Sequence, residues 1–545
     1  MPPIQTTVLG PHAATVEAAM ERLASQDAMR RLWDRDASLW TTDRATQALI
    51  RNRLGWLTIA NVMAQQADAL RQFTQEVRQS GLTHVFLLGM GGSGLFAEVC
   101  SSTFGVAPNH PGFTVLDTTD PTALRTHQRR HPLKELLVIM SSKSGATSET
   151  TALSKYFYEA FASVNSHPGS HCLAITDAGT PLETQAKRWQ VRRLFVHGPG
   201  TGADVGGRFS ALTYFGLVPA ALMGVDVALL LRRVNEMLIR CGPGGSIHDN
   251  PAVHLGAVLG ALAQDGRDKL TLVCAPELAS AGTWIEQLIA ESLGKEGRGI
   301  IPVFGEPLRE PSIYADDRIF VELQLADHAD EAITRRLHEL EQAGHPIVRI
   351  RWDDRHDLGG EVAKWCVATA MAGHLLALNP FDEPNVQESK DRTKALLETY
   401  ARQGYFLETE PLLFEDADVA VSGTVVSGRL RSLAQSVSDL FQQLRPREYV
   451  ALLSFLPRTP ALDRALTVLR ERIARQLSGH ATMLGFGPRY LHSTGQLYKG
   501  GPDAGVFLLF TTQEHEDLPI PGEPYTFGVL KHAQALGDFQ AMQQR

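Results

Sequence analysis

The sequence predicts an α/β protein in which two doubly wound parallel-sheet domains follow a helical N-terminal segment and precede a C-terminal α/β extension. Short apolar runs rich in β-branched residues recur along the chain, each followed by a Gly, Ser or Asp turn and an amphipathic stretch. This alternation is typical of βα units that feed a parallel sheet covered on both faces. At 545 residues the chain is also too long for a single hydrophobic core.

The helical segment is predicted over residues 1–80, because apolar side chains recur there at helical spacing with few Gly or Pro. The first α/β domain is expected over residues 81–235, the second over residues 236–395, and the extension over residues 396–545. The predicted strands are 83–88, 113–116, 136–140, 172–176 and 193–196 in the first domain, 270–274, 299–303, 319–323 and 347–350 in the second, and 449–455, 483–486 and 506–510 in the extension.

Composition argues against several classes of function. The net charge of −8 provides no general attraction for nucleic acid or an anionic membrane, and no apolar run approaches the roughly 18 residues that cross a bilayer. The N-terminus lacks the basic region and apolar core of a secretory leader, so we expect a cytoplasmic protein. The five Cys residues are scattered and none lies in a CxxC pair, which argues against a disulfide framework or a zinc site.

The segment 140–150 follows a predicted strand and leads into a predicted helix. At such a helix N-terminus, free backbone N–H groups and the positive end of the helix dipole favour an anion. Hydroxyl groups and one ammonium suit a phosphate monoester, although an ordinary Ser/Thr-rich turn with a surface lysine is the alternative. The candidate phosphate-binding residues in this segment are Ser142, Lys143, Ser144 and Thr147.

A glycine-rich turn directly follows the first predicted strand of the first domain. The glycines at 89, 91 and 94 satisfy the GxGxxG pattern of dinucleotide-binding proteins, and Asp117 follows the next strand at about the distance of a ribose-binding carboxylate. Many tight turns satisfy the same pattern, so an NAD-dependent oxidoreductase stays an alternative. Ser93 in this turn fits better with one sugar phosphate held between two loops at the carboxyl ends of the strands.

Five segments, in this order, resemble motifs of the phosphoglucose isomerase (glucose-6-phosphate isomerase) family, over roughly residues 80–395. Three others, at 33–40, 51–56 and 491–496, resemble the isomerase half of bacterial transaldolase/phosphoglucose isomerase fusions. Only a helical lead precedes the first domain, so no transaldolase barrel is expected there. The five family motifs are 89–93, 142–150, 205–210, 287–295 and 379–390.

The resemblance implies two sugar-isomerase (SIS) domains and a metal-independent enzyme without a cofactor. It would interconvert glucose 6-phosphate and fructose 6-phosphate by ring opening and proton transfer through a cis-enediol. A carboxylate can take and return that proton if water is kept away, and Glu291 matches the family's base. Arg208 matches a cation that suits the enediolate. A solvated helix face and a surface ion pair are the respective alternatives. The motifs also place Gly92 and Gln287 against the substrate.

Ring opening needs a proton donor and a base, which the family supplies as a Lys and a His. Lys390 matches the Lys. The segment that resembles the family's His motif, 491–496, falls about a hundred residues after Lys390 instead of before it. This reversed order predicts that His492 reaches the site by a rearranged route, either from the partner subunit of a homodimer with a shared active site or within the same chain. A structural His is the alternative.

Two further points stay open in the sequence. Glu383 stands where the family usually has Gln beside the phosphate, and an added carboxylate weakens dianion binding unless it turns away or pairs with a cation. The alternative function from a different class is a non-catalytic SIS-domain phosphosugar sensor, which would have no reason to retain Glu291, Arg208 and Lys390 together. Association with a separate transaldolase and the choice between glucose and mannose 6-phosphate are not decided by the sequence.

Overall fold

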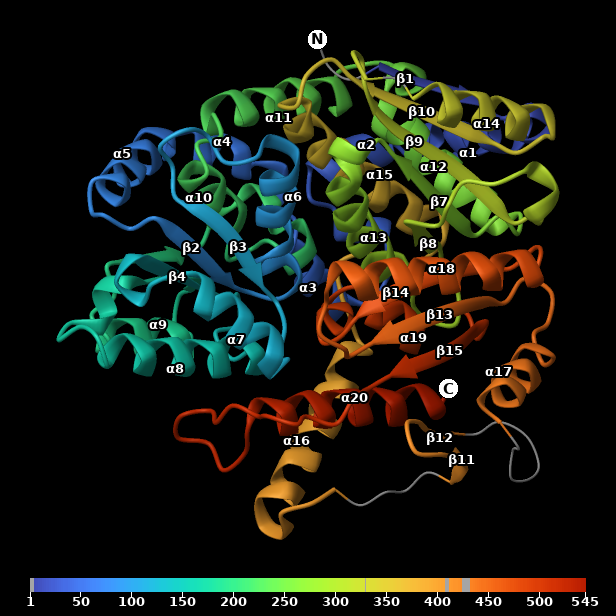
Figure 1. The fold of residues 1–545 in the computed structure, drawn as a ribbon. Coiled ribbons are helices and arrows are strands. Elements are labelled where there is room, and N and C mark those ends of the chain that lie inside the picture. Colours follow the sequence, from blue (N-terminus) through green and yellow to red (C-terminus); the bar gives the residue numbers. More distant parts are fainter. Residues whose placement is uncertain (1–3, 329, 407–410, 424–431) are drawn as a thin grey trace.

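The structure is a computed structural model that describes residues 4–328, 330–406, 411–423 and 432–545. Within these ranges the chain forms two five-stranded sheets, one three-stranded sheet and a short antiparallel pair, β11 (Leu412–Glu415) and β12 (Ala420–Ser422). Figure 1 shows the first domain on the left, the second at the upper right and the extension below it. The predicted fold class is therefore confirmed.

The first domain is a parallel sheet in the order β3-β2-β4-β5-β6 with helices on both faces. Alternate strand residues face opposite sides, so that Val85 and Leu87 join a core with α6, α10 and α5 (Ala67–Arg78), whereas Phe86 and Leu88 pack with α7, α8 and α9. The strands are β2 (His84–Leu88), β3 (Gly112–Leu116), β4 (Leu136–Ser141), β5 (Cys172–Asp177) and β6 (Arg193–His197), and the helices are α6 (Leu95–Phe104), α7 (Pro121–Arg130), α8 (Ser148–Ala162), α9 (Pro181–Arg188) and α10 (Tyr214–Leu222).

The second domain has the strand order β1-β10-β9-β7-β8, and its first strand comes from the N-terminus. Strand β1 pairs antiparallel with β10, with Ile4 opposite Arg351. The prediction of a purely helical segment over residues 1–80 is therefore wrong at its start. The strands are β1 (Ile4–Val8), β7 (Lys269–Cys274), β8 (Ile301–Phe304), β9 (Arg318–Leu325) and β10 (Ile347–Trp352), and the helices are α11 (Val227–Cys241), α12 (Pro251–Gln264), α13 (Ala279–Leu293), α14 (Glu331–Gln342) and α15 (Asp357–Leu375).

The rest of the N-terminal segment is helical, as predicted, and serves both domains. Its first helix packs on α12 of the second domain, whereas its last helix covers one face of the first sheet. Trp56 stacks on Phe209, the residue after Arg208, with ring centroids 5.6 Å apart. These helices are α1 (Ala13–Ser25), α2 (Ala28–Trp33), α3 (Arg44–Arg51), α4 (Ile59–Ala64) and α5 (Ala67–Arg78).

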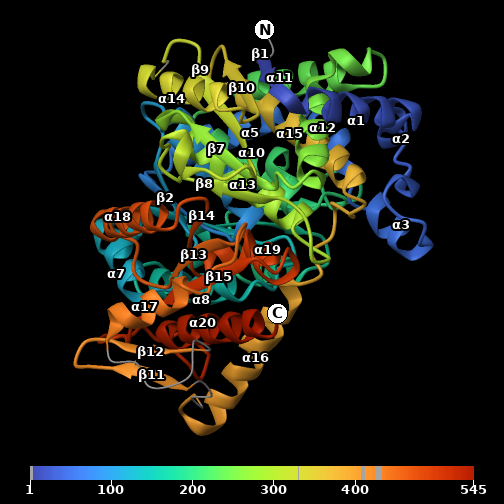
Figure 2. The same cartoon turned by 90° about the vertical axis from the view of Figure 1, so that its right-hand side faces the viewer.

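The extension carries a parallel sheet in the order β14-β13-β15, with paired helices α16 and α20 beneath it in both Figure 1 and Figure 2. The buried Glu306 carboxylate fastens this sheet to the second domain, because it accepts from Arg318 Nη1 at 2.8 Å and from the Thr482 backbone N–H at 2.8 Å. The elements are α16 (Val386–Gln403), α17 (Leu433–Phe441), β13 (Tyr449–Ser454), α18 (Pro460–Gln476), β14 (Ala481–Phe486), α19 (Gly495–Gly500), β15 (Gly505–Phe510) and α20 (Phe527–Gln543).

No helix in the described ranges is both long enough and apolar enough to cross a membrane.

Candidate active site

Three tight turns meet at the carboxyl end of β2. Glycines in the first turn let its backbone contact the backbones of the other two. A Cβ added to Gly92 would lie 1.9 Å from the carbonyl oxygen of Gly207, next to Arg208. Gly91 has a positive φ of 51°, and a Cβ there would lie 2.6 Å from the carbonyl oxygen of His492. The absence of a side chain at Gly92 therefore lets two backbones pack together, and the expected contact of Gly92 with the substrate stays a prediction.

Helix α13 places Gln287 and Glu291 one turn apart on the same face. Gln287 Nε2 donates to Glu291 Oε2 at 3.2 Å and to the carbonyl oxygen of His492 at 2.9 Å. Burial raises the pKa of Glu291 to about 7, although the Arg208 guanidinium acts in the opposite direction. A carboxyl group that titrates near neutrality can both take and return a proton. Its burial argues against a solvated helix face.

The Arg208 guanidinium is buried and held from several sides. Its Nη2 donates to the carbonyl oxygens of Pro380 and Asp382, at 2.8 and 2.9 Å. Its Nη1 donates to Glu383 Oε2 at 2.8 Å and lies 3.9 Å from Glu291 Oε1. A permanent cation is thereby fixed next to the carboxyl group of Glu291, which a surface ion pair would not achieve.

Glu383 resolves one question that the sequence left open, because its carboxylate pairs with a cation, Arg208. Burial disfavours the charged form of Glu383, but the attraction of Arg208 and its hydrogen bond outweigh burial and lower the pKa. The negative charge of Glu383 also contributes to the raised pKa of Glu291. A glutamate at position 383 therefore places a negative charge beside the candidate base, which a glutamine would not do.

His492 lies at the same site within one chain, on the turn (Arg489–His492) that follows β14. Its Nε2 is 2.8 Å from Oε1 of Glu149. In this structure the rearranged route of His492 lies within one chain. The reversed order of the motifs is accommodated because β14 directs its carboxyl end toward the glycine turn of the first domain. Oligomeric state stays a prediction.

Glu149 is a site residue to which sequence reasoning assigned no role. Its Oε1 accepts from His492 and from Gln534 Nε2, at 2.8 and 2.7 Å, and its Oε2 accepts from Ser148 Oγ at 2.9 Å. Burial alone would raise the pKa of Glu149, but the attraction and hydrogen bond of His492 lower it to about 2. The available signal was a carboxylate in the first turn of a helix, inside the matched segment 142–150.

The predicted phosphate loop precedes α8, whose N-cap residue Thr147 makes no side-chain capping bond to the helix. The Thr147 hydroxyl instead shares a 2.9 Å hydrogen bond with Ser142 Oγ. Ser144 is exposed at the same turn. The adjacent glycine turn is tied to this loop, because Ser141 Oγ donates to the carbonyl oxygen of Ser93 at 2.6 Å. The open N–H groups of the α8 terminus suit an anion.

Lys143 differs from its expected role. Its Nζ lies 2.5 Å from Asp177 Oδ2 and donates to the carbonyl oxygens of Gly202 and Ala203, at 3.3 and 3.2 Å. Burial lowers the pKa of Lys143, and Asp177 opposes that effect. The ammonium therefore braces the loop before Arg208 and is not free to meet a phosphate.

Lys390 is not brought together with the other predicted residues. It lies on α16 with an exposed side chain, and no hydrogen bond or ion pair of its ammonium is found in the part of the chain that the structure describes. Its neighbour Ser389 points into the core and donates to Asp538 Oδ1 at 2.9 Å. Lys295, at the end of a matched motif, is a buried ammonium near Arg208: it binds Asp382 Oδ1 at 2.8 Å, and burial lowers its pKa to about 8.

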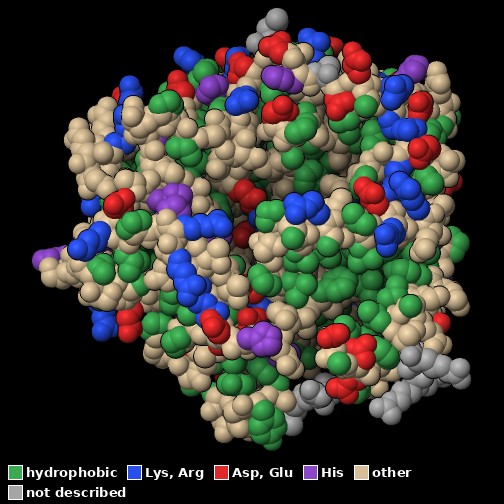
Figure 3. Space-filling view, viewed as in Figure 1, with side chains coloured by type: hydrophobic (Ala, Val, Ile, Leu, Met, Phe, Trp, Pro, Cys, Tyr) green, Lys and Arg blue, Asp and Glu red, His purple; other side chains and the backbone are tan. Residues whose placement is uncertain are grey.

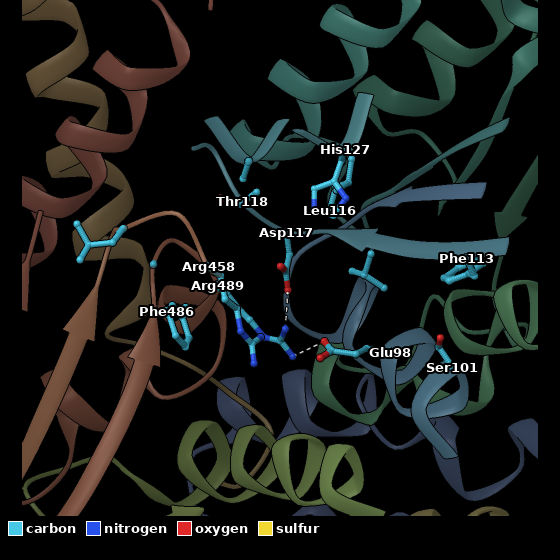
Figure 4. Close-up of a pocket in the computed structure, with 14 residues that line it drawn as sticks. Glu98, Ser101, Phe113, Leu116, Asp117, Thr118, His127, Arg458, Phe486 and Arg489 are labelled. Carbon is cyan, nitrogen blue, oxygen red and sulfur yellow. Dashed lines mark ion pairs between the residues drawn. The ribbon is translucent and has the colours of Figure 1, made fainter. Parts of the chain in front are cut away.

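A cavity of about 290 Å³ opens beside the site, between β3 and the extension. At its wall, Arg489 reaches Glu98 at 2.5 Å and Asp117 at 3.2 Å (Figure 4). Figure 3 shows the hollow between the first domain and the rest of the molecule, with acidic side chains at its floor. The structure argues against a dinucleotide site. Asp117, the candidate ribose-binding carboxylate, is paired with Arg489, and the backbone of His492 covers the glycine turn.

Across the described ranges, no group of three or more His, Cys, Asp or Glu side chains is arranged to hold a metal ion.

Comparisons with known proteins point to sugar isomerases. No protein-family model matches the chain. The chain is 26% identical to a probable glucose-6-phosphate isomerase of Haloarcula marismortui over 389 residues, which cover 65% of this chain and 87% of that protein. It is 28% identical to a protein of the same name from Natronomonas pharaonis over 408 residues, covering 68% and 91%.

Among solved structures, a glucose-6-phosphate isomerase from Chlamydia trachomatis superposes on 71% of this chain and 86% of its own, with a TM-score of 0.60 and 16% identity. At this identity the likeness concerns the fold alone.

Proposed function

We propose that this chain is an aldose–ketose isomerase that interconverts glucose 6-phosphate and fructose 6-phosphate. The observation that carries the proposal is the pairing of a buried carboxyl group, Glu291, whose pKa is raised to about 7, with the fixed cation Arg208. The names of the two relatives support hexose 6-phosphate as the substrate class. The His492–Glu149 pair on the other side of Gln287 supplies a second acid–base group.

Proton transfer is assigned to Glu291. In the open-chain aldose, its carboxylate removes the C2 proton, and the electron pair moves through C1 to the carbonyl oxygen, which gives a cis-enediolate. The proton of the C2 hydroxyl passes to O1, which moves the negative charge to the C2 oxygen. The same carboxyl group then returns its proton to C1 as the C2 carbonyl forms, which gives the ketose. Arg208 stabilises the negative charge of the enediolate, and the burial of both side chains keeps water from exchanging with the transferred proton.

Ring opening is assigned to His492. Because Nε2 faces the Glu149 carboxylate, the neutral imidazole keeps its proton on Nε2 and offers the lone pair of Nδ1. Nδ1 can accept the proton of the C1 hydroxyl as the bond between C1 and the ring oxygen breaks. Lys390 stays the proposed proton donor to the ring oxygen, and its ammonium is exposed.

The phosphate group is assigned to the N-terminus of α8. Backbone N–H groups there and the hydroxyls of Ser142, Ser144 and Thr147 would bind the dianion, with Ser93 at the neighbouring turn. Lys143 contributes indirectly, by holding the loop that leads to Arg208. A homodimer and an association with a transaldolase stay predictions.

The proposal is tested by incubating the purified protein with fructose 6-phosphate and measuring glucose 6-phosphate and mannose 6-phosphate separately. We expect glucose 6-phosphate to form, and activity to persist after treatment with EDTA. Tight binding of the hexose phosphate without turnover would favour the sensor alternative. Inactivation by EDTA that added zinc or manganese reverses would contradict the acid–base mechanism.

A further inference from the structure

One face of the C-terminal helix α20 is polar, although it is buried against the candidate site. Lys531, Gln534 and Asp538 follow each other at intervals of three and four residues and therefore share a face. Their exposed fractions are 3%, 2% and 0%. Buried polar groups persist when they have partners, so the contacts of this face indicate what the helix holds in place.

Gln534 reaches the carboxylate that holds His492. Its Nε2 donates to Glu149 Oε1 at 2.7 Å, and its Oε1 accepts from Thr119 Oγ1 at 2.9 Å. The amide orientation follows from these two contacts, because a flipped amide would set its oxygen against a carboxylate oxygen. Gln534 thus fixes Glu149 in the position from which it accepts the Nε2 proton of His492.

Asp538 reaches the turn that carries His492. Its carboxylate accepts from Tyr490 Oη at 2.7 Å, from Lys499 Nζ at 2.6 Å and from Ser389 Oγ at 2.9 Å. Tyr490 lies two residues before His492 and Lys499 seven residues after it. One buried carboxylate therefore holds the His492 segment from both sides along the chain.

We propose that α20 is a positioning element of the active site, in which Gln534 aims the Glu149 carboxylate at His492 and Asp538 holds the turn from which His492 extends. The inference rests on the proposed role of His492 in ring opening. Both residues act through other side chains and are positioning residues. Their shared effect is to keep the Nε2–H tautomer of His492 and to direct Nδ1 toward the sugar.

The test measures ring opening apart from isomerisation. In the Glu291→Gln background, proton transfer between C1 and C2 is blocked, whereas exchange between the α and β anomers of glucose 6-phosphate still requires ring opening. Exchange NMR reads this rate. We expect Gln534→Leu to slow the enzyme-catalysed exchange by about 10- to 100-fold, as for other residues that orient a catalytic group, with little change in sugar affinity. Gln476→Leu, at an exposed position of α18 in the same extension, is the matched control and should have no effect.

Failure of the inference and failure of the proposed function give different results. If the Glu291→Gln protein accelerates anomer exchange and Gln534→Leu does not reduce it, α20 has no positioning role. If the Glu291→Gln protein does not accelerate the exchange at all, the proposed ring-opening activity itself is wrong. Thermal unfolding of each variant establishes that a slow exchange rate belongs to a folded protein.

Gln534→Glu provides a readout that a merely structural role would not change. A protonated carboxyl group can donate to Glu149 as the amide does, whereas an ionised one repels it. We therefore expect the activity of Gln534→Glu, divided by that of the wild type, to rise as the pH is lowered from 8.5 to 6. A ratio that stays constant over this range would overturn the role of Gln534 as a hydrogen-bond donor to Glu149.

Discussion

Two buried glutamates stand on opposite sides of the candidate site, and their pKa values shift in opposite directions. Burial raises the pKa of Glu291 to about 7, because nearby Arg208 only partly compensates the lost hydration. Glu149 is more deeply buried, yet the attraction of His492 and the hydrogen bonds from His492 and Ser148 lower its pKa to about 2. The comparison teaches that the number of donors around a carboxylate decides whether it can exchange a proton or only orient a neighbour.

The largest expected effect comes from removing the proton-accepting carboxylate of Glu291. Glu291→Gln preserves the shape of the side chain but cannot accept a proton, so we expect kcat for fructose 6-phosphate to fall by about 10³- to 10⁴-fold. KM should stay within a few-fold of the wild-type value in a steady-state assay. Glu296→Gln, a change of the same kind at an exposed position in the tight turn that follows α13, is the control. A loss of affinity as large as the loss of rate would contradict the role of base.

The next largest effect is expected from removing the imidazole of His492. His492→Ala should slow the closed-ring substrate by about 10²-fold or more, and an open-chain phosphosugar far less, because the latter bypasses ring opening. Parallel kinetics with the two substrates measure the difference. An equal loss on both substrates would assign His492 to proton transfer, and an unimpaired variant would make it structural.

A third experiment combines the Glu291 and His492 variants in mixed oligomers. Mixing Glu291→Gln and His492→Ala proteins under subunit exchange should restore no activity, because His492 and Glu291 of one site belong to one chain. Recovery of activity after proven exchange would mean that the site is shared across a dimer interface.

A smaller effect is expected on the thermal stability of variants at the two glutamates. Glu149 has a lowered pKa, so its contribution to folding is present above its ordinary pKa of 4.5 and is lost as the pH falls through about 2. Glu291 has a raised pKa, so its ionisation costs folding free energy as the pH rises from 4.5 through about 7. Thermal unfolding at pH 8 should therefore show a higher Tm for Glu291→Gln and a lower Tm for Glu149→Gln. The reverse order would contradict the assigned environments.

The smallest effect concerns the phosphate loop. Ser142→Ala should raise KM several-fold and leave kcat nearly unchanged, because it removes one hydroxyl from a site built mainly of backbone N–H groups. Lys143→Ala should instead lower kcat together with stability, since Lys143 braces the loop before Arg208. A Lys143→Ala protein with normal stability and a raised KM would instead indicate that the Lys143 ammonium binds the phosphate.

Much of the fold could be predicted because buried parallel strands are continuous apolar runs. Each of the twelve predicted strands corresponds to an observed one, from β2 to β10 and from β13 to β15. Strand β1 was missed since its residues, Ile-Gln-Thr-Thr-Val, are half polar and its partner β10 lies some 340 residues later. An edge strand takes its conformation from that partner, which a local pattern does not reveal.

The candidate site was predictable only where one short segment carries the chemistry. Glu291 and Arg208 lie in matched motifs and are found side by side. The partners Glu149 and Gln534 are 343 and 42 residues away from His492, and no periodicity links them. Lys143 has the right chemistry for a phosphate, but Asp177, at the end of the neighbouring strand, binds its ammonium instead.

The contact between Gly92 and Gly207 has a consequence for maps of mutational tolerance. With 1.9 Å between an added Cβ and a backbone oxygen, even alanine at position 92 would push the Arg208 turn away from its carbonyl partners. A survey of all substitutions would therefore score Gly92 as intolerant as Glu291, although one position is constrained by packing and the other by chemistry. Only a measurement that separates protein abundance from turnover would tell the two kinds of intolerance apart.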